Sequence, residues 1–103
     1  MVVIGTDIVE AYFALRIGHK VIRAARSQYE AWLAIAQASI WRGPEDVKAT
    51  LPRASIPKAG RVVFNIKGND YRLIAAVNYR AEVVVIRFFG SHADYDRVDA
   101  ESL

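Results

Sequence analysis

The feature that most constrains this chain is a glycine-centred turn between two runs of β-forming residues. Gly68 and Asn69 separate the run that begins at Arg61 from the run that follows Asp70. Glycine at the first position of a two-residue turn is typical of a type II′ hairpin. The turn sets the register of the strands, with Lys67 opposite Asp70, and side-chain alternation then assigns each residue to one of two faces.

One face of the predicted hairpin is apolar. In this register Phe64 lies opposite Leu73, and a second turn near Arg80 and Ala81 starts a third strand. If that turn also contains an even number of residues, the third strand continues the same face. The residues predicted to form the core face are Val62, Phe64, Ile66, Tyr71, Leu73, Ala75, Val77, Val84, Ile86 and Phe88.

The opposite face combines cationic, polar and aliphatic side chains. Its predicted members are Arg61, Asn65, Lys67, Arg72 and Arg87, among Val63, Ile74, Val83 and Val85. Two interpretations fit this pattern. Long basic side chains often lie over aliphatic neighbours on a solvated sheet, and a basic, half-apolar face can also bind an anionic partner. Alternation along the strands does not separate these interpretations.

The rest of the chain predicts helices on the core face. A short β-branched run at Met1 to Ile4 indicates an edge strand, and Thr6 or Asp7 is the expected cap of a first helix. Gly18 predicts an interruption, and an apolar stripe indicates a second helix from His19 to about Ile40. If helix continued through Gly18, the cations on it would form a basic stripe that could contact phosphates. Those cations are Arg16, Lys20 and Arg23.

Shorter helical segments complete the predicted fold. Pro44 and the two acids after it favour one helical turn, and Ser91 is the expected cap of a short helix near the C-terminus. We therefore predict a single α+β domain over residues 1–103: an N-terminal edge strand and two helices on one face of an antiparallel β-meander, with a short C-terminal helix.

Composition restricts the chemistry. The chain has no cysteine, which excludes disulfides and thiolate metal sites and fits a reducing cytoplasm. The first ten residues carry two acids and no basic residue, so they do not resemble a signal peptide, and no apolar run is long enough to span a membrane. His19 and His92 are far apart with no third ligand at metal spacing, so we expect no metal and no cofactor. The net charge of +3 and pI near 9.4 are compatible with an RNA partner.

Several ordered motifs resemble one protein family. VVFNIKGNDYRLI (62–74) and IRFFGSHADYD (86–96), preceded by Ala31-Trp32, Trp41 and DVKATLP (46–52), are similar to the HigB-type toxins of bacterial toxin–antitoxin pairs, a branch of the RelE-like ribonucleases. The resemblance covers residues from about Tyr29 onward, whereas the unusually apolar first helix departs from the family pattern. It implies a RelE-like fold, a cytoplasmic toxin that cuts mRNA on the translating ribosome, and a helix-turn-helix antitoxin as partner.

The residues present suit RNA cleavage without a metal, because the substrate supplies its own nucleophile, the 2′-hydroxyl. Arg72 and Arg87 are candidates for stabilising the charged phosphorane. His92 is the candidate for proton transfer, since an imidazole ordinarily titrates near pH ~6.5. Tyr95, one helical turn further on, could bind the phosphate or stack on a base. Each of these residues could also be purely structural.

Further residues are expected to bind RNA, and other functions stay open. The expected RNA-binding set is Lys67, Asn65, Arg61, Lys20 and Arg23. The antitoxin is expected to cover the basic face through exposed Val63, Val83 and Val85, or to exclude the ribosome by bulk. The alternatives are a ParE-like gyrase poison, which shares the fold without needing His92 or Tyr95, and a non-enzymatic RNA- or protein-binding module.

Overall fold

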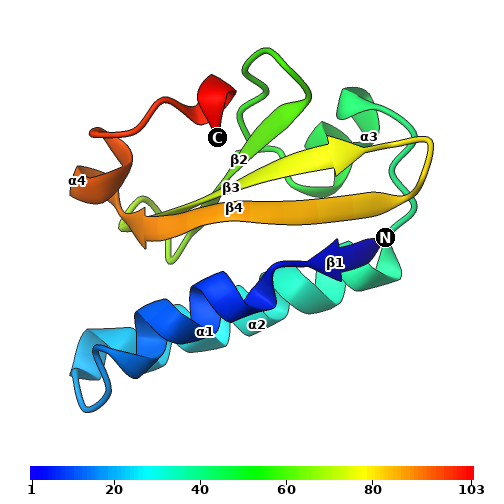
Figure 1. The fold of residues 1–103 in the computed structure, drawn as a ribbon. Coiled ribbons are helices and arrows are strands. Elements are labelled where there is room, and N and C mark those ends of the chain that lie inside the picture. The colour runs from blue at the N-terminus through cyan, green and yellow to red at the C-terminus, as the bar shows by residue number, and fades with distance from the viewer.

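A computed structural model describes all residues, 1–103, and shows a four-stranded mixed sheet. The strands are β1 (Val2–Ile4), β2 (Arg61–Ile66), β3 (Tyr71–Asn78) and β4 (Val83–Ser91), and their order across the sheet is β1-β4-β3-β2. β1 is parallel to β4, and the other pairs are antiparallel (Figure 1). The predicted α+β class, the N-terminal edge strand and the antiparallel meander are therefore confirmed.

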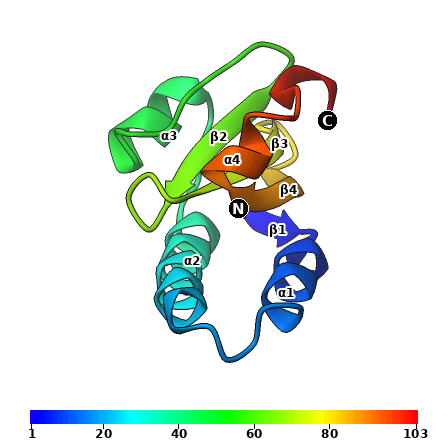
Figure 2. The same cartoon turned by 90° about the vertical axis from the view of Figure 1, so that its left-hand side faces the viewer.

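Two long helices cover one face of this sheet. α1 (Thr6–Ala14) and α2 (Lys20–Ala38) lie side by side beneath it, while α3 (Pro44–Thr50) flanks β2 (Figures 1 and 2). α4 (His92–Tyr95) follows β4 directly, and a short 3-10 turn, η1 (Ala100–Ser102), lies near the C-terminus. No helix combines the length and apolar composition that crossing a bilayer requires.

Glycines lie at the start of α1 and in the turn that follows it. The cap is Gly5, not Thr6 or Asp7: it has a φ of 93°, and an added Cβ there would lie 2.8 Å from the Ile86 carbonyl oxygen. Gly18, with a φ of 91°, lies in the turn between α1 and α2, which confirms the predicted interruption. Helix does not continue across this turn, so the basic stripe along one continuous helix does not form.

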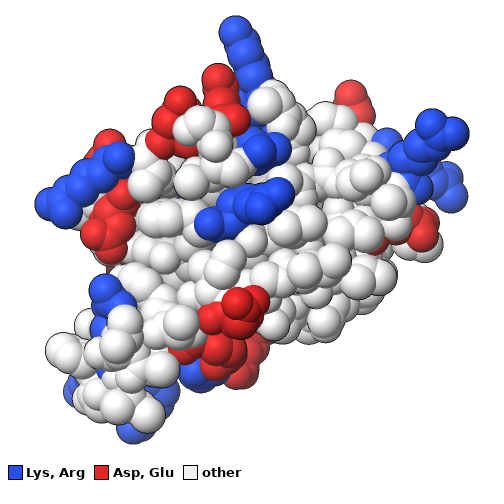
Figure 3. All heavy atoms as spheres, viewed as in Figure 1, with Lys and Arg blue, Asp and Glu red and all other residues white.

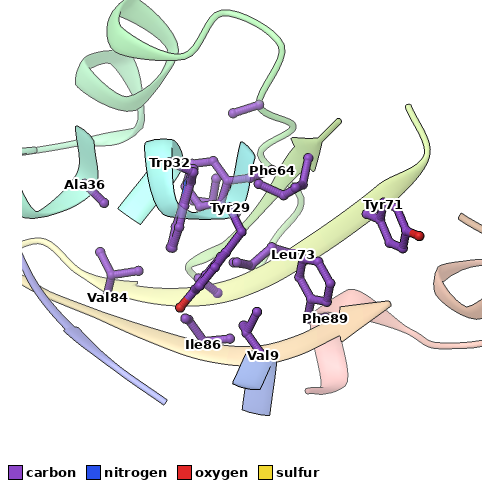
Figure 4. Packing of buried hydrophobic residues seen from close by; sticks show 14 of the residues in the cluster. Val9, Tyr29, Trp32, Ala36, Phe64, Tyr71, Leu73, Val84, Ile86 and Phe89 are labelled. Atoms are coloured by element: carbon purple, nitrogen blue, oxygen red, sulfur yellow. The ribbon is translucent and has the colours of Figure 1, made fainter. Parts of the chain in front are cut away.

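The core lies between the two helices and the sheet. The apolar stripe of α2 is buried as predicted, and its Trp32 ring packs against Phe64 with a centroid distance of 5.1 Å (Figure 4). Tyr29 stacks on Trp32, and Trp41 stacks on Phe64, each with a centroid distance of 6.0 Å. Both tryptophans therefore serve packing, as the helical pattern favoured for Trp32.

The hairpin register is confirmed. Asn65 pairs with Arg72 and Phe64 with Leu73, and Gly68 has a positive φ of 63°, a conformation that favours glycine. Lys67 also has a left-handed φ, of 54°. The predicted apolar face of these two strands is buried throughout.

A β-bulge changes the face assignment near the end of the third strand. Ala75 pairs with Ile86 and Ile74 with Phe88, so Arg87 is an extra residue on β4. One extra residue reverses the alternation beyond it. The prediction that Phe88 lies on the core face is therefore wrong: Phe89 is buried there instead, against Tyr12, Phe13, Tyr29 and Tyr71.

The other face of the sheet is less open than predicted. Val63 is only 2% exposed and Ile74 is fully buried, while Val83 and Val85 are half-buried. The C-terminal segment contributes to this cover, because η1 contacts β2, α4 contacts β3, and Arg61 Nε donates to the main-chain oxygen of Leu103. The expectation of an exposed Val63 is therefore wrong, since segments distant in sequence fold back over it.

Candidate active site

The hairpin turn and α4 form one corner of the molecule. The Asp70 main-chain N–H donates to the Lys67 carbonyl at 3.2 Å and closes the turn. The main-chain N–H of His92, the first residue of α4, donates to the Asp70 carbonyl at 2.9 Å. This bond fixes the start of α4 to the turn, so side chains from the two segments share one site.

Arg72 occupies the centre of this corner. Its Nη1 donates to the Asn69 carbonyl at 3.1 Å and its Nη2 donates to the Asn69 side-chain oxygen, so the turn holds the guanidinium. The guanidinium carbon lies 5.6 Å from the centroid of the Tyr95 ring, within cation–π range. Arg72 is therefore positioned by the turn on one side and by α4 on the other.

His92 continues this arrangement beyond Tyr95. The two rings meet edge to face with centroids 6.4 Å apart, as expected for residues one helical turn apart. His92 Nδ1 lies 3.2 Å from Asp96 Oδ2. A carboxylate at Nδ1 orients the imidazole and leaves Nε2 available to a substrate. The structure thus brings together three of the four predicted catalytic residues: Arg72, Tyr95 and His92.

The backbone entering α4 depends on Gly90 and Ser91. Gly90 pairs with Arg72, and an added Cβ would lie 2.8 Å from Phe88 Cζ and 3.1 Å from Asp94 Cβ. The Ser91 hydroxyl accepts from the Asp94 main-chain N–H at 3.2 Å, and the Asp94 carboxylate accepts from the Ser91 N–H, which completes a capping box. The predicted Ser91 cap is confirmed, and α4 begins at a defined point despite its short length.

A shallow hollow separates this corner from the start of α2. Its lining includes Val21 of α2, Asn69 and Asp70 of the turn, and Ser91 and His92 at α4. Lys20 and Arg23 are exposed on the same end of α2 as Val21. The hollow thus connects the His92 corner with the exposed start of α2.

Two other predicted residues lie apart from the cluster. Arg87 is exposed at the bulge and has no hydrogen bond or ion pair to the corner. Arg61 is at the opposite end of β2, where it donates to the Ala59 carbonyl and to Leu103. Arg61 therefore holds the C-terminal segment. Asn65 is half-buried opposite Arg72.

Charges in the corner are largely balanced. Lys67 Nζ lies 2.8 Å from Asp70 Oδ2, a hydrogen bond that raises the lysine pKa above its ordinary value. Asp94 and Asp96 add negative charge on α4. Figure 3 shows Lys and Arg side chains interspersed with Asp and Glu on the face in view, without a continuous basic patch. The expected basic face is thus offset by acids from the turn and α4.

Sequence reasoning missed three supporting residues. The sequence predicts only a turn position for Asn69, yet Asn69 holds Arg72; Asp96 orients His92; and Gly90 permits the close approach of α4. Two signals were available: glycine within a β-branched and aromatic run marks a close approach, and His92 and Asp96 have the i,i+4 spacing of a helical pair. The structure has no group of three or more His, Asp or Glu side chains that could hold a metal.

Comparison with known families identifies the chain. A model of the HigB_toxin family, described as the RelE-like toxic component of a toxin–antitoxin system, matches residues 25–98. The match includes β2, β3, β4 and α4, and therefore the whole corner around Arg72. The chain belongs to this family, and its fold is compatible with the RelE-like fold. None of the curated proteins compared with the chain matches it significantly.

Proposed function

We propose that this toxin is an endoribonuclease that cleaves mRNA at the corner formed by Arg72, Tyr95 and His92. The observation that carries the proposal is the juxtaposition of a turn-held guanidinium, a phenol ring and a carboxylate-oriented imidazole. Phosphodiester cleavage needs a cation that binds the phosphate and a group that transfers a proton, both at one place.

The proposed reaction uses the substrate's own nucleophile. The 2′-oxygen attacks the adjacent phosphorus as its proton is removed, and the bond from phosphorus to the 5′-oxygen breaks as that oxygen gains a proton. A 2′,3′-cyclic phosphate and a 5′-hydroxyl result. Arg72 stabilises the negative charge on the phosphorane oxygens, His92 transfers a proton through Nε2, and Tyr95 contacts the phosphate or a base. None of these steps requires a metal ion.

We further propose that the mRNA is presented by the ribosome. Non-specific RNA affinity comes mainly from cations that neutralise phosphates. At this corner Asp70, Asp94 and Asp96 offset the cations, so attraction for free RNA is weak. A ribosome that positions the message would replace that missing affinity.

Mapping of transcript ends after brief induction tests the activity. New internal 5′ ends within translated messages should appear with the parent protein and disappear with Arg72→Ala. A gyrase poison or a binding module would produce no new ends. Purified protein should cut a message bound to ribosomes faster than the same message free in solution. In a ribosome-free assay, any residual cleavage should survive chelation.

A further inference from the structure

A groove of about 350 Å³ follows the outer edge of β2 on the helical side of the sheet. Its walls come from α2, from the segment after α3, and from β2 itself. The lining is mainly apolar, with Trp32, Ile35 and Leu51 among its members. It contains no carboxylate and two cations, of which Lys67 is paired with Asp70 and Arg53 has no ion pair. An apolar groove with the unpaired Arg53 in its lining fits an apolar segment that carries a carboxylate.

The strand edge inside this groove has free main-chain groups. β2 is the last strand of the sheet, and Val63 exchanges two hydrogen bonds of 2.9 Å with Ser55 on its outer side. Main-chain groups alternate in direction along a strand, so the N–H and C=O of Asn65 also point outward. None of the loop or turn hydrogen bonds reaches them. Asn65 therefore offers one donor and one acceptor to an added strand.

No segment of the chain pairs with the outer edge of β2 at Asn65. The pairing of Ser55 with Val63 is antiparallel, so a continuing strand would bring Arg53 opposite Asn65. Instead, Pro52 and Arg53 turn, and Lys48 Nζ holds the turn by donating to the carbonyls of Pro52 at 2.8 Å and Ala54 at 2.7 Å. The protein's own segment stops after one residue pair, and the groove begins there.

The groove wall includes Trp32, whose ring is held by the core. Trp32 is 4% exposed, and its indole N–H has no acceptor within the chain. The faces of this indole pack against Tyr29 and Phe64, so they are not available for stacking on an RNA base. Ile35, beside it, is 39% exposed. An apolar wall with an exposed Ile35 and no free aromatic face suits the aliphatic side chain of a peptide better than a nucleic acid base.

We propose that this groove binds an extended segment of the antitoxin, which adds a strand to the free edge of β2. The segment pairs with the main chain of Asn65, places an aliphatic side chain against Ile35 and Trp32, and directs a carboxylate to Arg53. Strand addition provides affinity through main-chain bonds, and the groove selects the side chain. The inference depends on the antitoxin that family membership implies and not on RNA cleavage.

Substitution of Asn65 tests the strand pairing. Asn65→Pro removes the outward N–H and keeps the bonds to β3, because proline is tolerated where the N–H faces away from the sheet. Asn65→Ala keeps the N–H and is the matched control. Affinity of the purified full-length toxin for its antitoxin should fall about tenfold with proline and change little with alanine.

Two further pairs of substitutions test the apolar contact and the charge in the groove, each with a control outside it. Ile35→Glu should weaken antitoxin binding about 30-fold or more. Ile40→Glu replaces an equally apolar residue, 61% exposed and outside the groove, and should leave binding within about twofold of the parent. Arg53→Glu should weaken binding, with Arg42→Glu as its control. Thermal unfolding of each variant shows whether the fold is retained.

Amide exchange of the unmodified toxin provides a test that needs no variant. Antitoxin should slow exchange at the Asn65 amide and shift the resonance of the Trp32 indole N–H. The proposal is overturned if antitoxin leaves both groups unchanged, if Ile35→Glu and its control behave alike, or if RNA and not antitoxin perturbs them. Absence of RNA cleavage by the unmodified toxin, with antitoxin binding at the groove intact, would contradict the proposed function alone.

Discussion

The two faces of the sheet differ in what holds their side chains in place. On the helical face, aromatic and aliphatic residues from α1, α2, β2, β3 and β4 are buried in one core. On the opposite face, near the hairpin turn, Arg72, Tyr95 and His92 are half-exposed and are positioned by individual hydrogen bonds and ring contacts. Burial stabilises the first face, whereas the polar side chains at this corner of the second face depend on individual bonds and ring contacts. Substitutions on the two faces should therefore separate stability from activity.

The largest effect is expected at His92. His92→Gln should slow single-turnover mRNA cleavage by about 10²–10⁴-fold, because an amide cannot transfer a proton, and should flatten the pH dependence. His19→Gln, in the exposed start of α2, is the matched control and should retain full activity. A lower melting temperature with unchanged cleavage at permissive temperature would show that His92 is structural. If Tyr95→Phe abolished activity at the same time, the proton-transfer role would belong to the tyrosine.

Phe64 tests the opposite face. Phe64→Ala removes a ring that packs against both Trp32 and Trp41, and should lower the free energy of unfolding by about 3–5 kcal/mol. Urea titration followed by tryptophan fluorescence measures the loss. Any protein that remains folded should cleave at nearly the parental rate. A large loss of cleavage in the folded fraction would mean that the two faces are not independent.

Substitution of Arg72 should have the opposite result to that of Phe64: cleavage is lost and stability is kept. Arg72→Ala should reduce cleavage about 10²–10³-fold while the melting temperature and antitoxin binding change little, and Arg72→Lys should restore only part of the rate. Arg87→Ala sharpens the comparison, because Arg87 lies at the bulge and not in the cluster. We expect it to lose about tenfold or less. Equal losses at both positions would extend the site to the bulge.

Gly90 links the two faces through the backbone. Gly90→Ala places a Cβ against Phe88 and Asp94 and should displace α4, with a loss of about 1–3 kcal/mol of stability. Because α4 carries His92 and Tyr95, cleavage should fall by more than stability alone explains. Stability is read from thermal unfolding and the rate from single-turnover cleavage below the transition. Gly68→Ala, with open space around its Cβ but a positive φ, separates backbone strain from the collision at Gly90.

Substitution of Tyr29 should have the smallest effect, and it should raise the stability of the fold instead of lowering it. It is 1% exposed, its hydroxyl has no partner, and burial raises its pKa to about 12. Tyr29→Phe removes an unpaired buried hydroxyl and should stabilise the fold by about 1 kcal/mol. In the parent protein the raised pKa means that the fold holds Tyr29 as the neutral phenol. The stability that depends on the neutral phenol is present below about pH 10 and is lost as pH rises through about 12. Unfolding curves across this range should show a weaker alkaline loss in the variant.

The local pattern of the chain was sufficient for the main elements. The glycine turn at Gly68 fixed the pairing of Phe64 with Leu73, and the apolar stripe of α2 identified the buried tryptophan. Ser91 was identified as a cap because its hydroxyl bonds within its own helix. These predictions depended on interactions between residues close in sequence or on strict alternation. Strict alternation predicts the wrong face for Phe88, because a bulge depends on how two strands fit together, which one strand's sequence does not specify.

The sequence by itself thus determined the fold class, the hairpin register, the helical core and the residue types that can act on a phosphate. Only the tertiary structure decided which of those residues meet. It joined Arg72 to Tyr95 and His92, left Arg87 at the bulge, tied Arg61 to the C-terminal segment, and opened the groove beside Asn65. The physical reason is range: turns, caps and periodic stripes depend on neighbours along the chain, whereas a site depends on contacts between segments that only folding brings together.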